Sequence, residues 1–385
     1  MATIPSIAMI PSGVKASKLY SVLPTDGTGD FTTTRASVAT RVNENGLIEE
    51  VASNVPRLDY SDGGCPSLLL EGTATNLITY SENFSDASWQ KVDCSITSNS
   101  AVSPDGTLNA SKYTSTGIDP YVQEYVSSTS ITNSLSIWVK GVGSTIGKTC
   151  KILAVRDSYA ETTNQTFTLT SEWQRIEASL TFSVAPTSTV GFRFDAPDNA
   201  VIGDEVLIWG AQFEENSYST SYIKNEGTAL GVTRTADTAT GSGSSTVINS
   251  TEGVLYFEGS ALDDSGGFRA ISLSDGVSNR LYIAYHADSN KISALLNSVT
   301  IDYVIADVTE YIKVAFKYKV NDFALWINGV EVNTATVGAT LPSGTLTQMQ
   351  FNSGFGGSHF YGKTKSVQVY TSALSDAELT TLTTI

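Results

Sequence analysis

Aromatic and amide side chains recur at short intervals between residues 89 and 125, a combination typical of sugar-binding sites. An aromatic ring can stack on the apolar side of a pyranose, while amide or carboxylate groups bind the sugar hydroxyls. The candidate glycan-binding residues in this stretch are Trp89, Tyr113, Tyr121, Gln123, Glu124 and Tyr125. The alternative is that these aromatic side chains fill a hydrophobic core or a contact between subunits.

A second candidate lies in the run Leu325-Trp-Ile-Asn-Gly329. Side chains alternate between the two faces of a strand, so Leu325 and Ile327 should face a core and Trp326 with Asn328 the opposite side. We therefore take Trp326 and Asn328 as further candidate glycan-binding residues. An oligomer interface would explain an outward tryptophan equally well.

Catalytic machinery is not evident in the sequence. The chain has two histidines, His286 and His359, and neither has a candidate nucleophile beside it in sequence, so a Ser-His-Asp triad or a histidine-rich metal site has few ways to form. Glycoside hydrolysis needs only two carboxylates about 5 to 10 Å apart. The adjacent pairs Glu214-Glu215 and Asp263-Asp264 would point to opposite faces if extended. We therefore predict no catalytic residues and no enzyme activity, with a polysaccharide depolymerase as the less favoured alternative.

Composition indicates an all-β protein of more than one domain. Only 16% of the 385 residues are charged, and serine, threonine, glycine and asparagine are abundant. The formal net charge of −16 would repel nucleic acid and anionic membranes. No stretch approaches the roughly 18 apolar residues of a membrane helix. We expect no nucleic-acid partner and no membrane insertion.

The three cysteines, Cys65, Cys94 and Cys150, are far apart and have no nearby histidine. This spacing indicates neither a zinc site nor a disulfide framework. We expect free thiols, and a single disulfide is the alternative. The N-terminus lacks the basic start and sustained apolar core of a signal peptide.

Residues 76–237 contain repeated runs in which apolar and polar residues alternate, a pattern that predicts strands of a half-buried antiparallel sandwich. These runs are Leu135–Lys140, Lys151–Arg156, Thr166–Leu169, Arg175–Phe182, Thr189–Phe194 and Glu205–Gly210. The segment 238–250, rich in glycine, serine and threonine, then predicts a linker. Strand patterns resume in residues 251–385, where Asn328-Gly329 is a strong hairpin signal. Ser375 and Glu378 form a capping box that predicts one short terminal helix.

Residues 1–75 predict extended segments and turns, because Pro56, Pro66 and several glycines interrupt any helix. Such a segment needs something to lie against, either the following domain or a neighbouring subunit. An ordinary long connector is the alternative.

Three stretches resemble known protein families. Residues 31–84, with Arg35-Ala-Ser-Val-Ala-Thr-Arg-Val-Asn, Asn54-Val-Pro-Arg-Leu-Asp-Tyr and Thr75-Asn-Leu-Ile-Thr-Tyr-Ser-Glu-Asn-Phe84, resemble a leader found in virion proteins of tailed bacteriophages. The region from Ser81-Glu-Asn-Phe84 to Thr233-Arg-Thr-Ala-Asp237 resembles a carbohydrate-binding-module type of jelly roll. The phrases Leu325-Trp-Ile-Asn-Gly329 and Ala373-Leu-Ser-Asp-Ala-Glu-Leu379 resemble a concanavalin A-like, laminin-G-type sandwich.

The laminin-G resemblance implies a weak candidate calcium site at a rim of the third region. Asp263, Asp264, Asp275 and Asp288 lie in predicted turns where their oxygens could converge. The alternative is that these aspartates form Asx-turns. Apart from this calcium site, no cofactor is expected.

Together these resemblances imply a non-enzymatic phage surface protein, of the head or tail fibre or spike type. Residues 1–75 would attach it to capsid or tail proteins, and two lectin-like sandwiches would bind host-surface glycans. Such fibres and spikes are usually trimers, so the resemblance implies a homotrimer, assembled in the host cytoplasm into the virion. The runner-up is a purely structural decoration or adaptor protein that binds no sugar.

Overall fold

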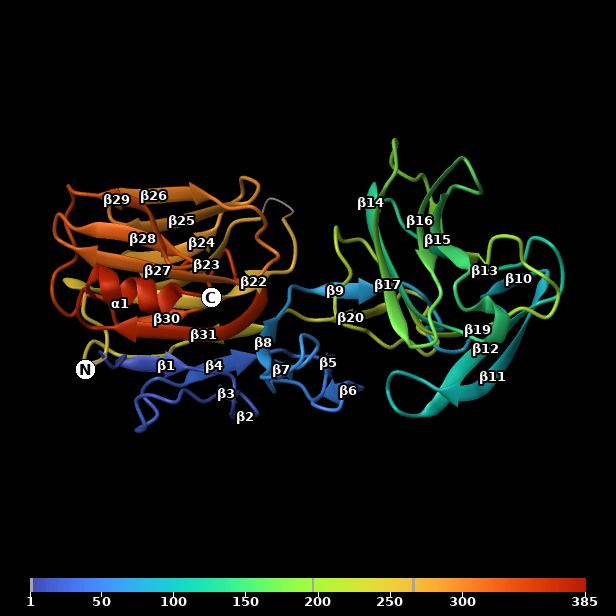
Figure 1. Cartoon of the computed structure of the whole chain (residues 1–385), viewed down its shortest axis with the longest axis horizontal. Helices are drawn as coiled ribbons and strands as arrows, with labels where there is room; N and C mark the ends of the chain where they lie inside the picture. The colour runs from blue at the N-terminus through green and yellow to red at the C-terminus, as the bar shows by residue number, and fades with distance from the viewer. Residues whose placement is uncertain (1–2, 196, 265–266) are drawn as a thin grey trace. The chain divides into compact units, whose positions relative to one another are not determined.

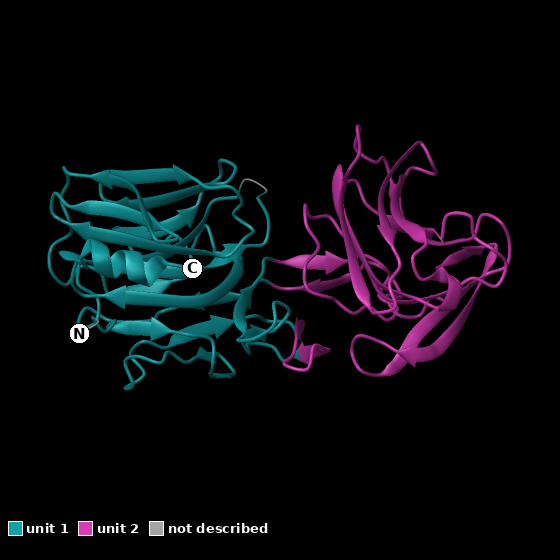
Figure 2. Cartoon of the chain, viewed as in Figure 1, with its two compact units in different colours: residues 1–38, 51–72, 236–385 teal, residues 39–50, 73–235 magenta. Residues whose placement is uncertain are grey.

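The chain folds into two compact units, and nearly all of its regular structure is β. The computed structural model describes residues 3–195, 197–264 and 267–385 (Figure 1). Unit 1 comprises residues 1–38, 51–72 and 236–385, and unit 2 comprises residues 39–50 and 73–235 (Figure 2). Each unit buries a large hydrophobic core of its own. The predicted all-β class with antiparallel sandwiches is confirmed.

Unit 1 is built around two antiparallel sheets. The larger follows the order β29-β28-β27-β22-β31-β8-β7, with β1 also pairing with β31. Its strands are β1 (Ile7–Met9), β7 (Arg57–Asp59), β8 (Ser67–Leu70), β22 (Glu252–Ala261), β27 (Ile312–Lys319), β28 (Phe323–Ile327), β29 (Val330–Ala335) and β31 (Gly362–Tyr370). The smaller has the order β26-β25-β24-β23-β30. Its strands are β23 (Arg269–Ser274), β24 (Arg280–Tyr285), β25 (Lys291–Leu296), β26 (Val299–Val304) and β30 (Gln348–Gln350).

Two local signals in the C-terminal part of unit 1 are confirmed. Asn328 and Gly329 have φ angles of 50° and 85° and form the turn between β28 and β29. The backbone N–H of Ser375 donates to the Glu378 carboxylate at 2.9 Å, and α1 (Asp376–Thr383) begins there. The helix packs on the outer face of the larger sheet through Leu379, which is fully buried.

Unit 2 is a sandwich of two five-stranded antiparallel sheets. One has the order β10-β13-β18-β15-β16 and the other the order β11-β12-β19-β14-β17. The first contains β10 (Gln90–Val92), β13 (Tyr121–Ser127), β15 (Thr149–Arg156), β16 (Glu161–Thr168) and β18 (Thr189–Asp195). The second contains β11 (Cys94–Val102), β12 (Leu108–Ser115), β14 (Thr132–Gly141), β17 (Gln174–Thr181) and β19 (Glu205–Glu214). Smaller elements are η1 (Gly143–Thr145) and the pairs β5 (Ala39–Val42) with β6 (Ile48–Val51) and β9 (Ala74–Asn76) with β20 (Val232–Arg234).

The units divide the chain differently from the boundaries that composition suggested. Residues 1–75 are extended as expected, but most of them pack on the sandwich at the far end of the sequence. β1 and β8 pair directly with β31, whose residues lie about 300 positions later. Residues 39–50 belong to unit 2 instead, where Ile48 packs beside an aromatic cluster.

The expected linker 238–250 is an ordered part of unit 1. Its first residues form β21 (Thr238–Thr240), which pairs with β4 (Phe31–Thr34) in a sheet that also contains β2 (Val14–Lys15) and β3 (Lys18–Leu19). Ser242 is fully buried, and its hydroxyl donates to the Gly29 carbonyl at 2.6 Å. Small polar residues are found both in flexible linkers and in closely packed strands at the edge of a sheet. Composition alone therefore could not distinguish a linker from the edge strand β21.

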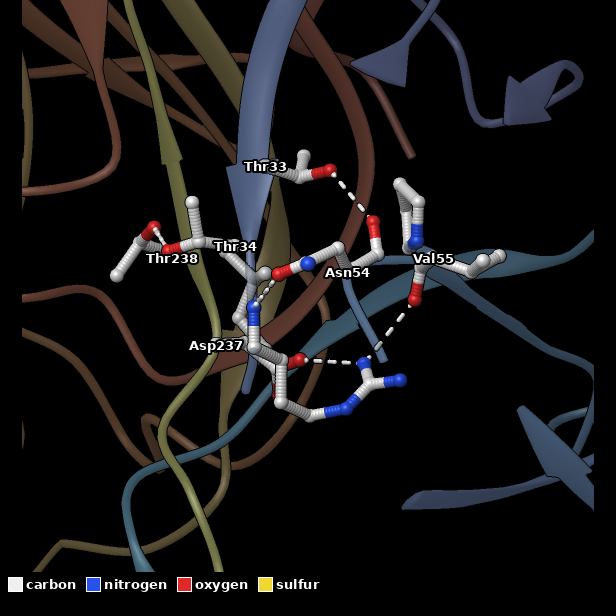
Figure 3. A pocket seen from close by; sticks show the side chains of 9 residues that line it. Thr33, Thr34, Asn54, Val55, Asp237 and Thr238 are labelled. Carbon is white, nitrogen blue, oxygen red and sulfur yellow. Dashed lines mark hydrogen bonds and ion pairs between the residues drawn. The ribbon is translucent and has the colours of Figure 1, made fainter. Parts of the chain in front are cut away.

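A buried ionic network joins the N-terminal segments of unit 1 to the start of its C-terminal part. Arg57 donates to the carboxylates of Glu71, at 2.6 Å, and Asp237. Arg35 donates to the other oxygen of Asp237, at 2.9 Å, and to the Val55 carbonyl, at 3.0 Å. Figure 3 shows Asp237 and Val55 beside a cavity of about 10 Å³, which has room for roughly one water molecule. The cavity is therefore too small for a sugar.

Among the described residues, no helix has the length and apolar character needed to cross a membrane. Cys65 is exposed, Cys94 is half-buried and Cys150 is buried, and all three are free thiols.

Candidate functional site

Three of the predicted glycan-binding residues meet on the outer face of one sheet of unit 2. Tyr121, Gln123 and Tyr125 alternate along β13 with Val122 and Val126, whose side chains lie in the core. Because successive side chains of a strand point to opposite faces, the three polar side chains project away from that core. The neighbouring strand β18 places Asp195, Arg193 and Gly191 directly opposite them, in that order.

Arg193 is the centre of this surface. Its guanidinium carbon lies 3.7 Å from the centroid of the Tyr121 ring, a cation–π contact. Its Nε donates to the carboxylate of Asp195, and its Nη1 donates to the Tyr159 hydroxyl at 2.9 Å. The Tyr159 hydroxyl in turn donates to Oε1 of Gln123 at 2.9 Å. We call these five residues, Tyr121, Gln123, Tyr125, Tyr159 and Arg193, the Tyr121 surface.

Tyr159 reaches this surface from the turn between β15 and β16. Asp157, Ser158 and Tyr159 have φ angles of 43°, 55° and 75°, a left-handed turn that carries the tyrosine over β18. The Asp157 carboxylate accepts the backbone N–H of Thr187 at 3.0 Å and so fixes the turn. Tyr159 remains 47% exposed and Tyr125 38% exposed, so both rings are accessible to a ligand.

Gly191 lets the side chains of this surface lie close to the sheet. A Cβ atom at this position would lie 2.9 Å from Nε2 of Gln123 and 3.1 Å from the Tyr125 ring. Gln123 is fully buried, and its Nε2 makes no hydrogen bond of good geometry within the described chain. Gln123 therefore supports the surface from within, because its Oε1 accepts from the Tyr159 hydroxyl while its amide is not open to a ligand.

Burial shifts the pKa values of Arg193 and of the groups around it. It raises the pKa of the Asp195 carboxyl even though Arg193 hydrogen-bonds to it. Burial lowers the pKa of Arg193, but the hydrogen bond and charge of Asp195 outweigh it and the net shift is upward. Burial and the nearby Tyr159 raise the pKa of Tyr121 to about 12, so this phenol is neutral at physiological pH. The surface thus offers tyrosine rings and a paired guanidinium.

The other two aromatic candidates of this region are core residues. Trp89 is 1% exposed and packs against Phe84 and Phe192, with ring centroids 4.8 and 5.8 Å away. Tyr113 is fully buried, with its ring 5.6 Å from that of Phe194. Both side chains point between the two sheets and cannot form a sugar platform without unfolding the sandwich.

Trp326 lies on the face of β28 opposite Leu325 and Ile327, as alternation predicts, but it is 5% exposed. Helix α1 covers this face, so the tryptophan belongs to a small second core. Asn328 forms the hairpin turn, and its Oδ1 accepts the backbone N–H of Lys313 at 2.9 Å. Neither residue forms part of an open surface.

The four candidate calcium ligands are each engaged locally. Asp263 pairs with Arg269 at 2.8 Å, and Asp288 with Lys291 at 3.1 Å. Asp264 accepts the backbone N–H of Asn290 at 2.9 Å. Asp275 accepts the backbone N–H of Val277 at 2.8 Å, as an Asx-turn does. In the part of the chain that the structure describes, no three acidic, histidine or cysteine side chains gather as a metal site.

Sequence reasoning missed Arg193, Tyr159 and Gly191. Gly191 and Arg193 lie at alternate positions of a run that was correctly predicted as a strand, so their shared face was readable. Their proximity to Tyr121 was not, because it depends on which strand pairs with β13. Tyr159 depends on a turn conformation that the sequence does not show.

Comparison with known proteins gives a match for the C-terminal part. Residues 245–380 match the model of the family described as the concanavalin A-like lectin/glucanases superfamily. No curated protein matches the chain. A carbohydrate-binding module, CBM40, of the Ruminococcus gnavus IT-sialidase is 20% identical; the match covers 35% of this chain and 84% of that one, with a TM-score of 0.31.

Two further solved structures are similar at the same low level. Domain 4 of AbnA, a GH43 extracellular arabinanase of Geobacillus stearothermophilus, is 15% identical over 38% of this chain and 73% of that one, with a TM-score of 0.31. The CBM22-1-CBM22-2 tandem of Xyn10C from Paenibacillus barcinonensis is 11% identical over 80% of this chain and all of that one, with a TM-score of 0.29. The family match to residues 245–380 alone shows that the C-terminal half of the chain contains a concanavalin A-like β-sandwich, which lies within unit 1.

Proposed function

We propose that this protein is a non-enzymatic glycan-binding protein of the tailed-bacteriophage virion surface. The observation that carries the glycan-binding proposal is the convergence of Tyr121, Gln123 and Tyr125 with Arg193 and Tyr159 on one accessible sheet face. Exposed rings and a guanidinium are groups that can bind a pyranose: the ring faces stack on the sugar and the guanidinium donates to its hydroxyls. The lectin-type sandwich in unit 1 supports the same class of ligand.

The virion assignment rests on the phage-type leader motifs in residues 31–84. A single sugar site of this size binds weakly, so adhesion to a host surface would depend on several copies acting together. A homotrimer attached to capsid or tail proteins would supply those copies. The oligomer should be measured by light scattering of the purified chain, with a trimeric mass as the expected result.

Of the carboxylates considered above for hydrolysis, Glu214 is not open to a substrate. This carboxylate is fully buried and accepts hydrogen bonds from Gln212 Nε2, at 2.9 Å, and the Thr220 hydroxyl, at 2.6 Å. It is therefore occupied inside the protein and is not presented to a substrate. Incubation with a host polysaccharide should release no reducing sugar, and any such release would refute the non-enzymatic assignment.

The glycan proposal is tested by binding of the intact chain to a glycan array and to host cells. Tyr125→Ala and Arg193→Gln should each weaken binding by about tenfold or more, since hot-spot side chains of this kind contribute roughly 1.4 kcal/mol or more. Tyr303→Ala is the control, because Tyr303 is an exposed tyrosine (41%) that belongs to unit 1, whereas the Tyr121 surface belongs to unit 2. A correctly folded protein that binds no glycan or cell would overturn the proposal and favour the structural decoration protein.

A further inference from the structure

The outer face of the smaller sheet of unit 1 carries a second group of aromatic and cationic side chains, of which Arg280 and Phe268 are half-buried and Tyr282 is buried. Arg280 and Tyr282 alternate along β24 with Leu281 and Ile283, which lie in the core. Arg280 and Tyr282 therefore share the outer face. Phe268 extends this face, with its ring 5.4 Å from that of Tyr282 in an edge-to-face arrangement.

A glycine-rich loop, residues 352–358, brings another ring to the same place. Gly354 has a φ of 95°, and a Cβ there would lie 3.0 Å from Cβ of Ser274 and 3.3 Å from Cβ of Arg280. Only glycine allows the loop to approach the sheet this closely. Nε2 of Gln350 donates to the Gly354 carbonyl at 3.3 Å, which holds the loop down. Phe355 is thereby presented at the surface, 43% exposed.

The Arg280 guanidinium lies between two rings. Its carbon is 4.6 Å from the centroid of Phe355 and 5.3 Å from that of Tyr282. Nη1 donates to the Ser353 carbonyl at 2.9 Å, which positions the group but does not neutralise it. We call Arg280, Tyr282, Phe268 and Phe355 the Arg280 surface.

Arg280 differs from Arg269 and Arg193 in that no carboxylate pairs with its guanidinium among the described residues. Arg269, at the start of the neighbouring strand, pairs with Asp263 at 2.8 Å, and Arg193 of unit 2 pairs with Asp195. Within the described residues Arg280 forms no ion pair, although the chain has 39 acidic and 23 basic residues. An unpaired guanidinium in so acidic a protein is complementary to an anion supplied from outside. The planar fork of an arginine matches a carboxylate with two parallel hydrogen bonds.

We propose that the Arg280 surface binds a sugar ring that bears a carboxylate. Arg280 would bind the carboxylate, and the exposed face of Phe355 would stack on the apolar side of the ring. The Tyr121 surface, whose guanidinium is already paired, suits a neutral pyranose instead. The two surfaces also belong to different units. The proposal for the Arg280 surface can therefore be tested independently of the proposal for the Tyr121 surface. The shared chemistry covers uronic acids and sialic acids.

The test is calorimetric titration of the full chain with two acidic probes, trigalacturonate and sialyllactose, and one neutral probe, lactose. At least one acidic probe should bind, and more weakly as salt rises, because the contact is partly exposed. Which of the two binds identifies the source of the carboxylate. Arg280→Gln should raise its Kd by about tenfold or more, since hydrogen bonds to charged groups contribute roughly 1.5 to 3 kcal/mol. Phe355→Ala should weaken it about fivefold through the lost stacking contact.

Two controls separate this inference from the proposal for unit 2. Arg193→Gln should leave acidic-probe binding unchanged, and Arg280→Gln should leave lactose binding unchanged. Phe355 is exposed, so Phe355→Ala should fold. It therefore still tests the proposal if Arg280→Gln fails to fold. The proposal is overturned if neither acidic probe binds, or if binding persists unaltered in both Arg280→Gln and Phe355→Ala.

Discussion

Individual buried charges determine how firmly the N-terminal segments are held in unit 1. Arg57 is fully buried and pairs with both Glu71 and Asp237. Glu71 lies 14 residues later in the chain and Asp237 lies 180 residues later. Removing one partner of a buried pair leaves the other charge without compensation in a medium of low polarity. The carboxylates that remain would then destabilise the folded state directly.

Arg57→Met should lower the free energy of unfolding of unit 1 by about 3 to 5 kcal/mol. Lys18→Met is the control in the same unit, because Lys18 pairs with Asp30 at 2.7 Å but its side chain is 36% exposed. Exposed pairs contribute about 1 kcal/mol or less. Denaturant unfolding of both variants measures the difference, and equal effects would contradict the structural role given to Arg57.

A buried carboxyl gives unit 2 a specific pH dependence. Glu124 is 2% exposed, and burial raises its pKa above the ordinary value of 4.5 despite a hydrogen bond from the Thr79 backbone N–H at 2.8 Å. The folded state therefore binds this proton more tightly than the unfolded state does. The stability that results is present below pH 4.5 and is lost as the pH rises through the raised pKa.

Glu124→Gln removes this titration. The variant should lose part of the fall in unit 2 stability that we expect of the natural protein as the pH rises above 4.5. Thermal unfolding across this range measures it. A fall of the same size in both proteins would show that Glu124 does not titrate there.

At the scale of elements, local signals were readable from the sequence and distant pairings were not. Alternating runs identified many of the strands but not β10 to β13 of unit 2, whereas Asn328-Gly329 identified a hairpin and Ser375 with Glu378 identified α1. Tyr121, Gln123 and Tyr125 were chosen by residue type, and their shared face became evident only with strand β13. The pairing of β4 with β21, about 200 residues later, leaves no local pattern, so the linker was expected where a strand forms. For the same reason Trp326 was expected to be exposed, because its cover comes from a separate helix.

Helix α1 should stabilise unit 1 through the face it covers. Leu379 is fully buried in the cluster that contains Trp326, so Leu379→Ala should cost about 2 to 5 kcal/mol and increase quenching of tryptophan fluorescence by iodide. Thr380→Ala, at an exposed position of the same helix, should have little effect. Unchanged quenching in Leu379→Ala would show that the helix does not shield Trp326.

At the scale of the whole molecule, unit 2 is largely an insertion into unit 1. The chain leaves unit 1 after residue 72 and returns at residue 236, and the antiparallel pair β9 and β20 brings the two ends of the insertion together. The main cores of the units share no residue. Unit 1 is therefore discontinuous in sequence but complete without the insertion.

Replacing residues 77–231 with an Asn-Gly turn should leave unit 1 folded, because Asn76 and Val232 already face each other across β9 and β20. Calorimetry should show one transition close to that of unit 1 in the full chain. A fragment of residues 76–385 should behave in the opposite way and lose that transition, since it lacks β1, β7 and β8. A stable 76–385 fragment would contradict the proposed interdependence.

The inserted position of unit 2 also has a mechanical consequence. A pulling force applied through the segments before β1 and after α1 acts on unit 1, where β1 and β31 are hydrogen-bonded neighbours. Ile7 at the start of β1 faces Val369 near the end of β31, so such a load would peel this pair apart from one end. Tension does not pass through residues 73–235 until unit 1 has opened. The Tyr121 surface would therefore keep its shape while unit 1 is under load.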